Sequence, residues 1–119
     1  MKTAELSGVA LDWAVAKCEG HEQTAPRVYQ GFVIAPGANG TGEVFTPATN
    51  WAQGGPIIER EGLQLWKGRS WNAAYGNSVN PSDDEIFSGP TPLIAAMRCY
   101  VASKLGDKVK IPAELLEAA

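Results

Sequence analysis

The sequence is poor in the residues that bind metals or carry out catalysis. Its 119 residues include one histidine, His21, and two cysteines, Cys18 and Cys99. No pattern of cysteine or glutamate near His21 has the spacing of a metal site. A catalytic triad that depends on histidine would have to use this one residue. We therefore expect that the protein holds neither a metal nor a cofactor.

Nucleophilic and acid–base catalysis leave no motif in the sequence either. No two carboxylates are positioned by the sequence for acid and base roles. The context of a nucleophile elbow, which exposes a reactive hydroxyl, is missing around Ser70, Ser78 and Ser88. We therefore predict a protein that binds its target and is not an enzyme.

Positive charge and long apolar runs are also scarce. The formal net charge is −3 and the isoelectric point is near 5.1, which disfavours broad binding to the nucleic-acid backbone. The longest acidic cluster, residues 83–85, is too short for a mimic of DNA. No apolar run approaches the ~20 residues that span a bilayer, and the first residues lead directly into a helix. We expect a cytoplasmic protein without a membrane partner.

The composition is that of one globular domain. Hydrophobic residues make up 45% of the chain and charged residues 19%, so a packed core is expected. At this length a continuous core forms without metals or disulfide bonds. Cys18 and Cys99 both lie among apolar neighbours in predicted helices, so we expect them to be reduced core residues.

The spacing of apolar residues predicts a first helix over about residues 8–19. Ser7 would cap its start, and Gly20 would take the left-handed position at its end. Trp13 lies off the apolar stripe, where it would either cover a second layer of the core or stand at a binding surface. The stripe predicted to be buried comprises Leu11, Ala14, Val15 and Cys18.

The strongest helix signal covers residues 92–105. Thr91 would cap the helix, Pro92 suits its first turn, and Gly106 would close it. Apolar residues surround most of this helix, so we predict that it is the central helix of the core.

Strand signals lie between these helices. Residues 28–34 have the alternation of a strand, 43–46 would be a shorter partner, and 35–42 would be the loop of that hairpin. A second hairpin is predicted from 63–66 and 70–75, which Lys67-Gly68-Arg69 would join as the turn.

Two regions rich in turn formers or near the end of the chain complete the prediction. Residues 76–90 are expected to form a surface excursion, and 112–117 a short terminal helical turn. The fold class is α+β: a small antiparallel sheet of two hairpins packed against two main helices, 8–19 and 92–105, plus a short helix at about 56–61.

Three segments in this order carry a family resemblance. They are 11–17 (LDWAVAK), 50–61 (NWAQGGPIIERE) and 89–101 (GPTPLIAAMRCYV). Together they resemble the NinX-like family of small tailed-phage proteins, and the match spans nearly the whole chain. The segments 35–42 and 67–88 do not carry the resemblance. It implies a phage accessory protein in the cytoplasm of an infected bacterium, and it implies no mechanism.

The second segment contains a candidate ligand site. Pro56 would open the short helix, whose first amides would point outward as an anion site. Gly54 and Gly55 would let the backbone approach a ligand closely. The Trp51 indole would stack on that ligand, and the Gln53 side-chain amide would form a hydrogen bond to it. In the alternative interpretation, the Gly-Gly-Pro sequence only forms a turn and the Trp51 indole lies in the core.

A second helix start of this type stands at residues 89–92, and the two starts would frame a pocket if they converge. Arg98 is the only charged residue in the apolar helix, so it needs a partner or a route to water. A structural pair with Asp12, Glu59 or Glu61 competes with contact to a ligand phosphate or carboxylate. Residues 59–61 are interpreted as a solvated helix face, although Arg60 lies close to the proposed anion site.

Two functional hypotheses follow. In the first, the protein binds and sequesters a phosphate-bearing or nucleotide-derived small molecule, such as a host immune signal, in a pocket lined by the glycine pair, Trp51, Arg98 and Trp71. In the second, it inhibits a host defence protein, such as a restriction or CRISPR component, through Trp66, Arg69 and Trp71. A chain this small would also suit a homo-oligomer with pockets shared between subunits.

Overall fold

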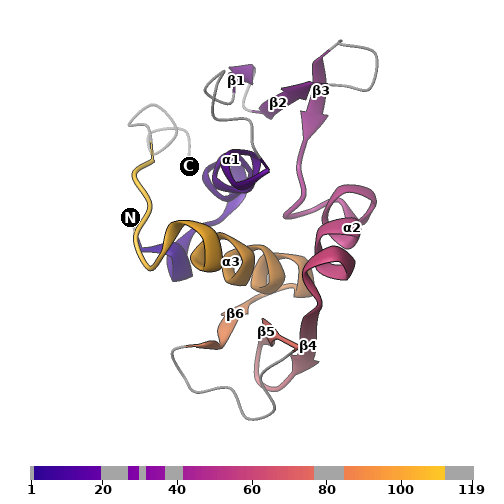
Figure 1. Cartoon of the computed structure of the whole chain (residues 1–119), viewed down its shortest axis with the longest axis vertical. Coiled ribbons are helices and arrows are strands. Elements are labelled where there is room, and N and C mark those ends of the chain that lie inside the picture. The colour runs from indigo at the N-terminus through magenta and orange to yellow at the C-terminus, as the bar shows by residue number, and fades with distance from the viewer. Residues whose placement is uncertain (1, 20–26, 30–31, 37–41, 77–84, 112–119) are drawn as a thin grey trace.

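The computed structural model describes residues 2–19, 27–29, 32–36, 42–76 and 85–111. Figure 1 shows helix α3 across the centre, with α1 on one side of it and the β4–β6 sheet on the other. The elements in chain order are η1 (Thr3–Glu5), α1 (Gly8–Cys18), β1 (Arg27–Tyr29), β2 (Phe32–Pro36), β3 (Gly42–Phe45), α2 (Trp51–Glu61), β4 (Leu63–Lys67), β5 (Trp71–Tyr75), β6 (Phe87–Gly89) and α3 (Pro92–Leu105).

Helix α3 has the bounds that the sequence predicts and is the centre of the core. The Thr91 hydroxyl accepts a hydrogen bond from the Ile94 amide at 3.2 Å, and Gly106 follows the helix with a φ of 87°. Side chains on several sides of α3 are buried because α1, α2, β5, β6 and η1 all pack against it. They include Leu93, Met97, Tyr100 and Val101.

Helix α1 is buried more completely than a single stripe predicts. All residues from 10 to 16 are buried, and Trp13 is only 8% exposed, so its indole belongs to the core. Ser7 was expected to cap the helix, but its side chain makes no capping bond. The left-handed Gly8 stands between Ser7 and the helical amides and redirects the chain there. The expected closing residue, Gly20, lies outside the described residues.

The β1–β3 sheet corrects the first predicted hairpin. Residues 28–34 do not form one strand, because β1 and β2 pair antiparallel with Tyr29 opposite Phe32. Strand β2 then pairs antiparallel with β3, with Val33 opposite Phe45, as the prediction expected of 43–46. Side chains alternate between the two faces with a period of two in one long strand and also in two shorter paired strands. The alternation in the sequence therefore did not distinguish these two arrangements.

The β4–β6 sheet confirms the second hairpin and extends it. Strands β4 and β5 pair antiparallel from Leu63 opposite Tyr75 to Lys67 opposite Trp71. The predicted surface excursion, 76–90, is wrong at its end, because β6 pairs with β5 there. The fold is therefore α+β, and its described residues form two separate three-stranded antiparallel sheets where the sequence predicted one.

Helix α2 is longer than the predicted helix over 56–61. It begins at Trp51 because the Asn50 side chain accepts a bond from the Ala52 amide at 2.9 Å. Pro56 therefore lies inside the helix and does not open it. The left-handed Gly62, with a φ of 69°, ends α2 and leads directly into β4.

The cysteines and the end of the chain were the subject of two further predictions. Cys18 and Cys99 form no disulfide, and burial raises the pKa of the Cys99 thiol to about 11, as suits an unreactive core residue. The predicted helical turn over 112–117 lies outside the described residues. None of the helices in the described part of the chain has the length and hydropathy of a membrane span.

Candidate functional site

The starts of α2 and α3, which the sequence suggested would frame a pocket if they converged, both border a small cavity of about 190 Å³. Trp51 borders it and is 54% exposed. The cavity is smaller than the roughly 300 Å³ at which small-molecule sites begin. The described residues that line it are Ala48, Thr49, Trp51, Thr91, Pro92 and Leu93, and none of these is charged. These residues therefore offer a phosphate no cation.

The predicted ligand contacts next to Trp51 are occupied by contacts within the protein. The Gln53 side chain accepts from the Thr46 amide at 2.7 Å and donates to the Val44 carbonyl at 2.7 Å. Gly54 is buried, and a Cβ there would lie 2.4 Å from the Pro47 carbonyl oxygen. The glycine thus permits close packing of α2 on its neighbours and does not admit a ligand. Gly55 lies beside the Trp51 ring.

Arg98 does not pair with any of the three carboxylates that the sequence suggests. Its Nε donates to the Leu6 carbonyl and its Nη1 to the Ser88 carbonyl, both at 2.7 Å. Burial lowers the pKa of Arg98 from its ordinary value. The side chain ties the end of η1 to strand β6 and is a structural residue in this fold.

Arg60, near the end of α2, connects this helix to Glu19 at the end of α1 and to Tyr100 within α3. Its guanidinium forms a two-pronged bond to the Glu19 carboxylate, at 3.1 and 2.7 Å, and also donates to the Tyr100 hydroxyl at 3.1 Å. Its Nε pairs with Glu61 at 3.2 Å. These bonds raise the pKa of Arg60, and those to Glu19 contribute most. The interpretation of 59–61 as a solvated face is confirmed for Glu59 and Arg60, which are exposed, and is wrong for Glu61, which is half-buried.

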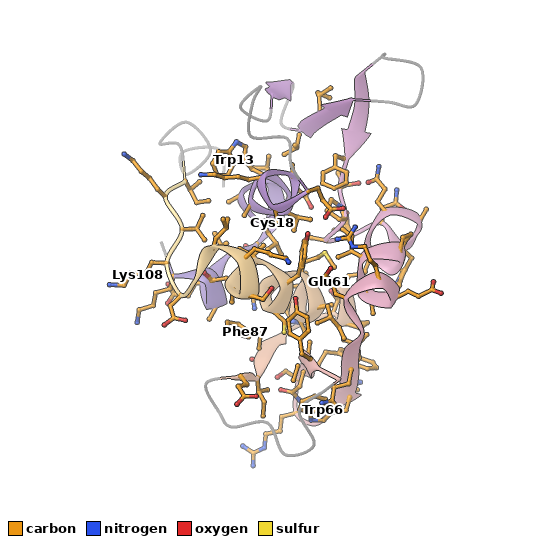
Figure 2. The ribbon with its side chains drawn as sticks, in the orientation of Figure 1. Trp13, Cys18, Glu61, Trp66, Phe87 and Lys108 are labelled. Atoms are coloured by element: carbon orange, nitrogen blue, oxygen red, sulfur yellow. The ribbon has the colours of Figure 1, made fainter. Side chains whose placement is uncertain are left out.

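The same network continues to the phenol of Tyr75. This hydroxyl donates to Glu61 at 3.0 Å and shares a 2.6 Å hydrogen bond with Ser103. Burial raises the pKa of Tyr75 to about 12, so the phenol stays protonated and able to donate at neutral pH. Figure 2 places Glu61 in the middle of the molecule, beside α3. The network stabilises helix packing.

The three residues proposed for a protein partner lie on the β4–β5 hairpin. Trp66 is 36% exposed on β4, and Arg69 is exposed in the turn (Figure 2 labels Trp66). Trp71 is half-buried on β5, packs against the core, and has the Lys67 ammonium 5.9 Å from its ring centre. Trp71 does not line the cavity at Trp51.

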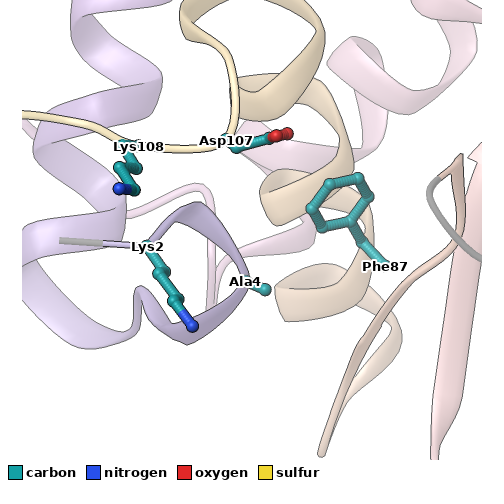
Figure 3. Close-up of a pocket in the computed structure, with 5 residues that line it drawn as sticks. All are labelled: Lys2, Ala4, Phe87, Asp107 and Lys108. Carbon is teal, nitrogen blue, oxygen red and sulfur yellow. The ribbon is translucent and has the colours of Figure 1, made fainter.

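A larger cavity, which the sequence did not predict, lies between η1, β6 and the segment after α3. Its volume is about 510 Å³ (Figure 3). Lys2 and Lys108 stand directly opposite each other in an isolated antiparallel bridge, and so their side chains leave the backbone on the same side. Neither forms an ion pair within the described residues. The lining comprises Lys2, Ala4, Phe87, Asp107 and Lys108.

The backbone around these lysines is held by the buried Thr3. Its amide donates to the Asp107 carbonyl at 2.8 Å, and its hydroxyl donates to the Gly106 carbonyl at 2.6 Å. Sequence reasoning missed this cavity because its two lysines lie near opposite ends of the chain and neither belongs to a motif. The bonds of Thr3 to Asp107 and Gly106 hold the two segments side by side.

A model of the family described as Bacteriophage P22, NinX matches residues 2–104, from the start of η1 almost to the end of α3. The chain belongs to this family. No curated protein matches the chain. The family supports a phage accessory protein, and the match includes all three segments on which the resemblance was based.

No metal site emerges in this NinX-family protein from its described part, where no group of three or more His, Cys, Asp or Glu side chains could hold an ion. One carboxylate is nevertheless unusual. Asp12 is only 6% exposed, and its Oδ1 accepts from the Ala48 amide at 3.0 Å, which ties α1 to the segment before α2. Burial raises the pKa of Asp12 from 3.8 to about 6, although the amide opposes this shift.

Asp12→Asn is expected to stabilise the protein at pH 7.5 by about 2 kcal/mol and to change its stability at pH 4 very little. Asparagine keeps an oxygen for the Ala48 amide but carries no charge to desolvate. Because the folded pKa lies above the unfolded one, the contribution of Asp12 is fully present below about pH 4 and lost by about pH 6. Urea unfolding at both pH values measures the difference. A difference that is independent of pH would contradict this origin.

Proposed function

We propose that this phage protein acts in the host cytoplasm by binding and sequestering a phosphate-bearing small molecule, without catalysis. The observation that carries the proposal is the pair of opposed lysines, Lys2 and Lys108, beside a cavity of about 510 Å³. That volume lies within the range of small-molecule sites. A nucleotide-derived signal of host immunity is a ligand of this class, and its removal would serve as counter-defence.

The charge of the two lysines supports an anionic ligand. Like charges directly opposite each other in an antiparallel pair repel and destabilise the pairing. Lys2 and Lys108 are both exposed, in a protein whose net charge is −3. A phosphate between the two ammonium groups would relieve the repulsion and accept hydrogen bonds from both. An anion therefore gains more at this bridge than at either lysine alone.

The cavity proposed to bind the ligand differs from the site that the sequence suggested around Trp51. The two arginines expected there, Arg60 and Arg98, donate to groups of the protein itself. Releasing Arg60 for a ligand would break its two bonds to Glu19, and releasing Arg98 would break its bond to the buried Leu6 carbonyl, at a cost of about 1 to 3 kcal/mol. The lysines of the larger cavity require no such exchange.

The Lys2→Ala, Lys108→Ala double variant is expected to bind its phosphate-bearing ligand at least about tenfold more weakly, because two charged hydrogen bonds are lost. Native mass spectrometry with added nucleotides and cyclic dinucleotides identifies the ligand and reports whether the protein is a homo-oligomer. Isothermal titration calorimetry then measures the loss.

The matched control is Lys67→Ala, Arg69→Ala, which removes the same charge from the exposed hairpin turn. It should bind the ligand as the parent does. Equal weakening in both double variants would mean that net charge alone attracts the ligand. This result would exclude the cavity as the binding site.

A second candidate function rests on the β4–β5 hairpin. Trp66, Lys67 and Arg69 are exposed together at its tip, and tryptophan and arginine are the residues that most often dominate protein interfaces. The two cations favour a partner protein with an acidic patch, such as a component of a restriction or CRISPR system. Trp71, half-buried beneath Lys67, would support this surface.

For this candidate, Trp66→Ala, Arg69→Ala is expected to weaken binding of a host defence protein by about a hundredfold or more, since each side chain is of hot-spot type. Surface plasmon resonance with the purified partner measures it. Lys2→Ala, Lys108→Ala is the control and should bind normally. Undiminished binding by the hairpin variant would exclude the hairpin as the interface.

A further inference from the structure

The larger cavity carries opposite charges at its two sides. Figure 3 shows Lys2 and Lys108 on one side, with the Asp107 carboxylate directed away from them toward Phe87. No ion pair within 4.0 Å joins Asp107 to either lysine among the residues that the structure describes. The cavity thus has a cationic side and an acidic side that do not neutralise each other directly.

This pattern disfavours a ligand that is anionic throughout. Inorganic phosphate or pyrophosphate would gain from the lysines, but any part of it near Asp107 would be repelled. A ligand that is anionic at one end and carries N–H or O–H donors at the other would satisfy both sides. The donors would reach Asp107, whose backbone is fixed by the bond from the Thr3 amide to its carbonyl.

Phe87 adds an aromatic surface beside the acidic side. It is half-buried on β6, where its pairing opposite Ala73 of β5 fixes its position. An aromatic ring of this kind stacks on a nucleobase. Ala4, which also lines the cavity, has a side chain small enough to leave the space in front of the ring open.

We infer that the ligand of this cavity is a nucleotide whose phosphate lies between Lys2 and Lys108, whose base stacks on Phe87, and whose nucleoside donors bond to Asp107. The inference rests on the proposed function, because it presupposes that a phosphate-bearing molecule occupies this cavity. It adds the class of ligand and assigns Phe87 and Asp107 as the residues that select a nucleotide over simple anions.

The test compares three probes by isothermal titration calorimetry on the whole protein: adenosine 5′-monophosphate, pyrophosphate and adenosine. The monophosphate should bind about tenfold more tightly than either of the others, since each of them lacks one half of the contacts. Phe87→Leu, which keeps an apolar side chain for the core, should remove this advantage over pyrophosphate. Asp107→Asn should tighten pyrophosphate binding and reduce the same advantage.

The outcomes distinguish a failure of the nucleotide inference from a failure of the proposed anion site. If pyrophosphate binds as tightly as the monophosphate, or Phe87→Leu leaves their ratio unchanged, the nucleotide inference falls and the anion site stands. If none of the three binds, or if Lys2→Ala, Lys108→Ala binds the monophosphate normally, the proposed site falls as well. Ala4→Leu provides a check that leaves the charges in place, because its larger side chain should narrow the cavity and weaken binding of the monophosphate.

Discussion

Gly54→Ala is expected to lower the free energy of unfolding by about 3 kcal/mol, although alanine is a better helix former than glycine by about 1 kcal/mol. The new Cβ would lie 2.4 Å from the Pro47 carbonyl oxygen and 2.6 Å from Leu93 Cδ2. The first of these is a backbone atom, so a change of side-chain rotamer cannot relieve the contact. Helix α2 would have to move away from its neighbours. Urea unfolding followed by tryptophan fluorescence measures the loss.

The neighbouring glycine provides a matched control. A Cβ at Gly55 would meet only the Trp51 ring, at 3.8 Å, which is an ordinary contact. Gly55→Ala is therefore expected to stabilise the protein by about 0.5 to 1 kcal/mol through helix propensity. If both substitutions had the same sign, close packing would not be the reason for Gly54.

Arg98→Ala is expected to destabilise the protein by about 3 kcal/mol. The substitution removes charge-assisted bonds to two carbonyls, and one of these, that of Leu6, belongs to a residue with no exposed surface. The contact between η1 and β6 through this side chain would be lost with it. Thermal and urea unfolding of the variant measure the effect.

Arg98→Lys is the informative comparison. Lysine keeps the charge but has no planar fork, so it can replace only one of the two bonds. An intermediate loss of stability is expected. If Arg98→Lys were as stable as the parent, charge alone would be required at this position. If Arg98→Ala were stable but failed to bind the ligand, a direct role in binding would replace the structural one.

Gly54 and Arg98 have other roles in the structure than those that the sequence suggested. Gly54 and Arg98 looked like parts of a ligand site because close backbone approach and a lone charge on an apolar helix are typical of such sites. The structure gives both a packing role, with partners inside the protein. Within the described residues, the charges on which the two proposals rest lie elsewhere, at the Lys2–Lys108 bridge and at the tip of the β4–β5 hairpin.

The parts of the fold that could be predicted are those that local interactions control. Thr91, Pro92 and Gly106 act on amides and carbonyls within one turn of α3, so its bounds are readable from neighbouring residues. The β4–β5 hairpin follows from strand residues on both sides of a short turn. At α2, the Gly-Gly-Pro sequence suggested a start at Pro56, and the cap that Asn50 provides was not predicted.

Other features depended on contacts between distant segments. Nothing near Arg98 in the sequence indicates that two carbonyls, at Leu6 and Ser88, would replace a carboxylate as its partners. The sequence suggested Asp12 only as a partner for Arg98, whereas in the structure it is buried and accepts a hydrogen bond from the Ala48 amide. In the same way, β6 is too short to be predicted by periodicity and exists because β5 offers it an edge.

The sequence by itself thus determined the α+β class, the two main helices and one hairpin, because caps, turns and apolar spacing act over a few residues. Tertiary structure alone decided the division into two sheets and the burial of Asp12. It also decided the cavity between η1, β6 and the end of α3. That cavity depends on a bridge between Lys2 and Lys108, and such a pairing is set by how α3 and η1 pack on the core, which no short stretch of sequence encodes.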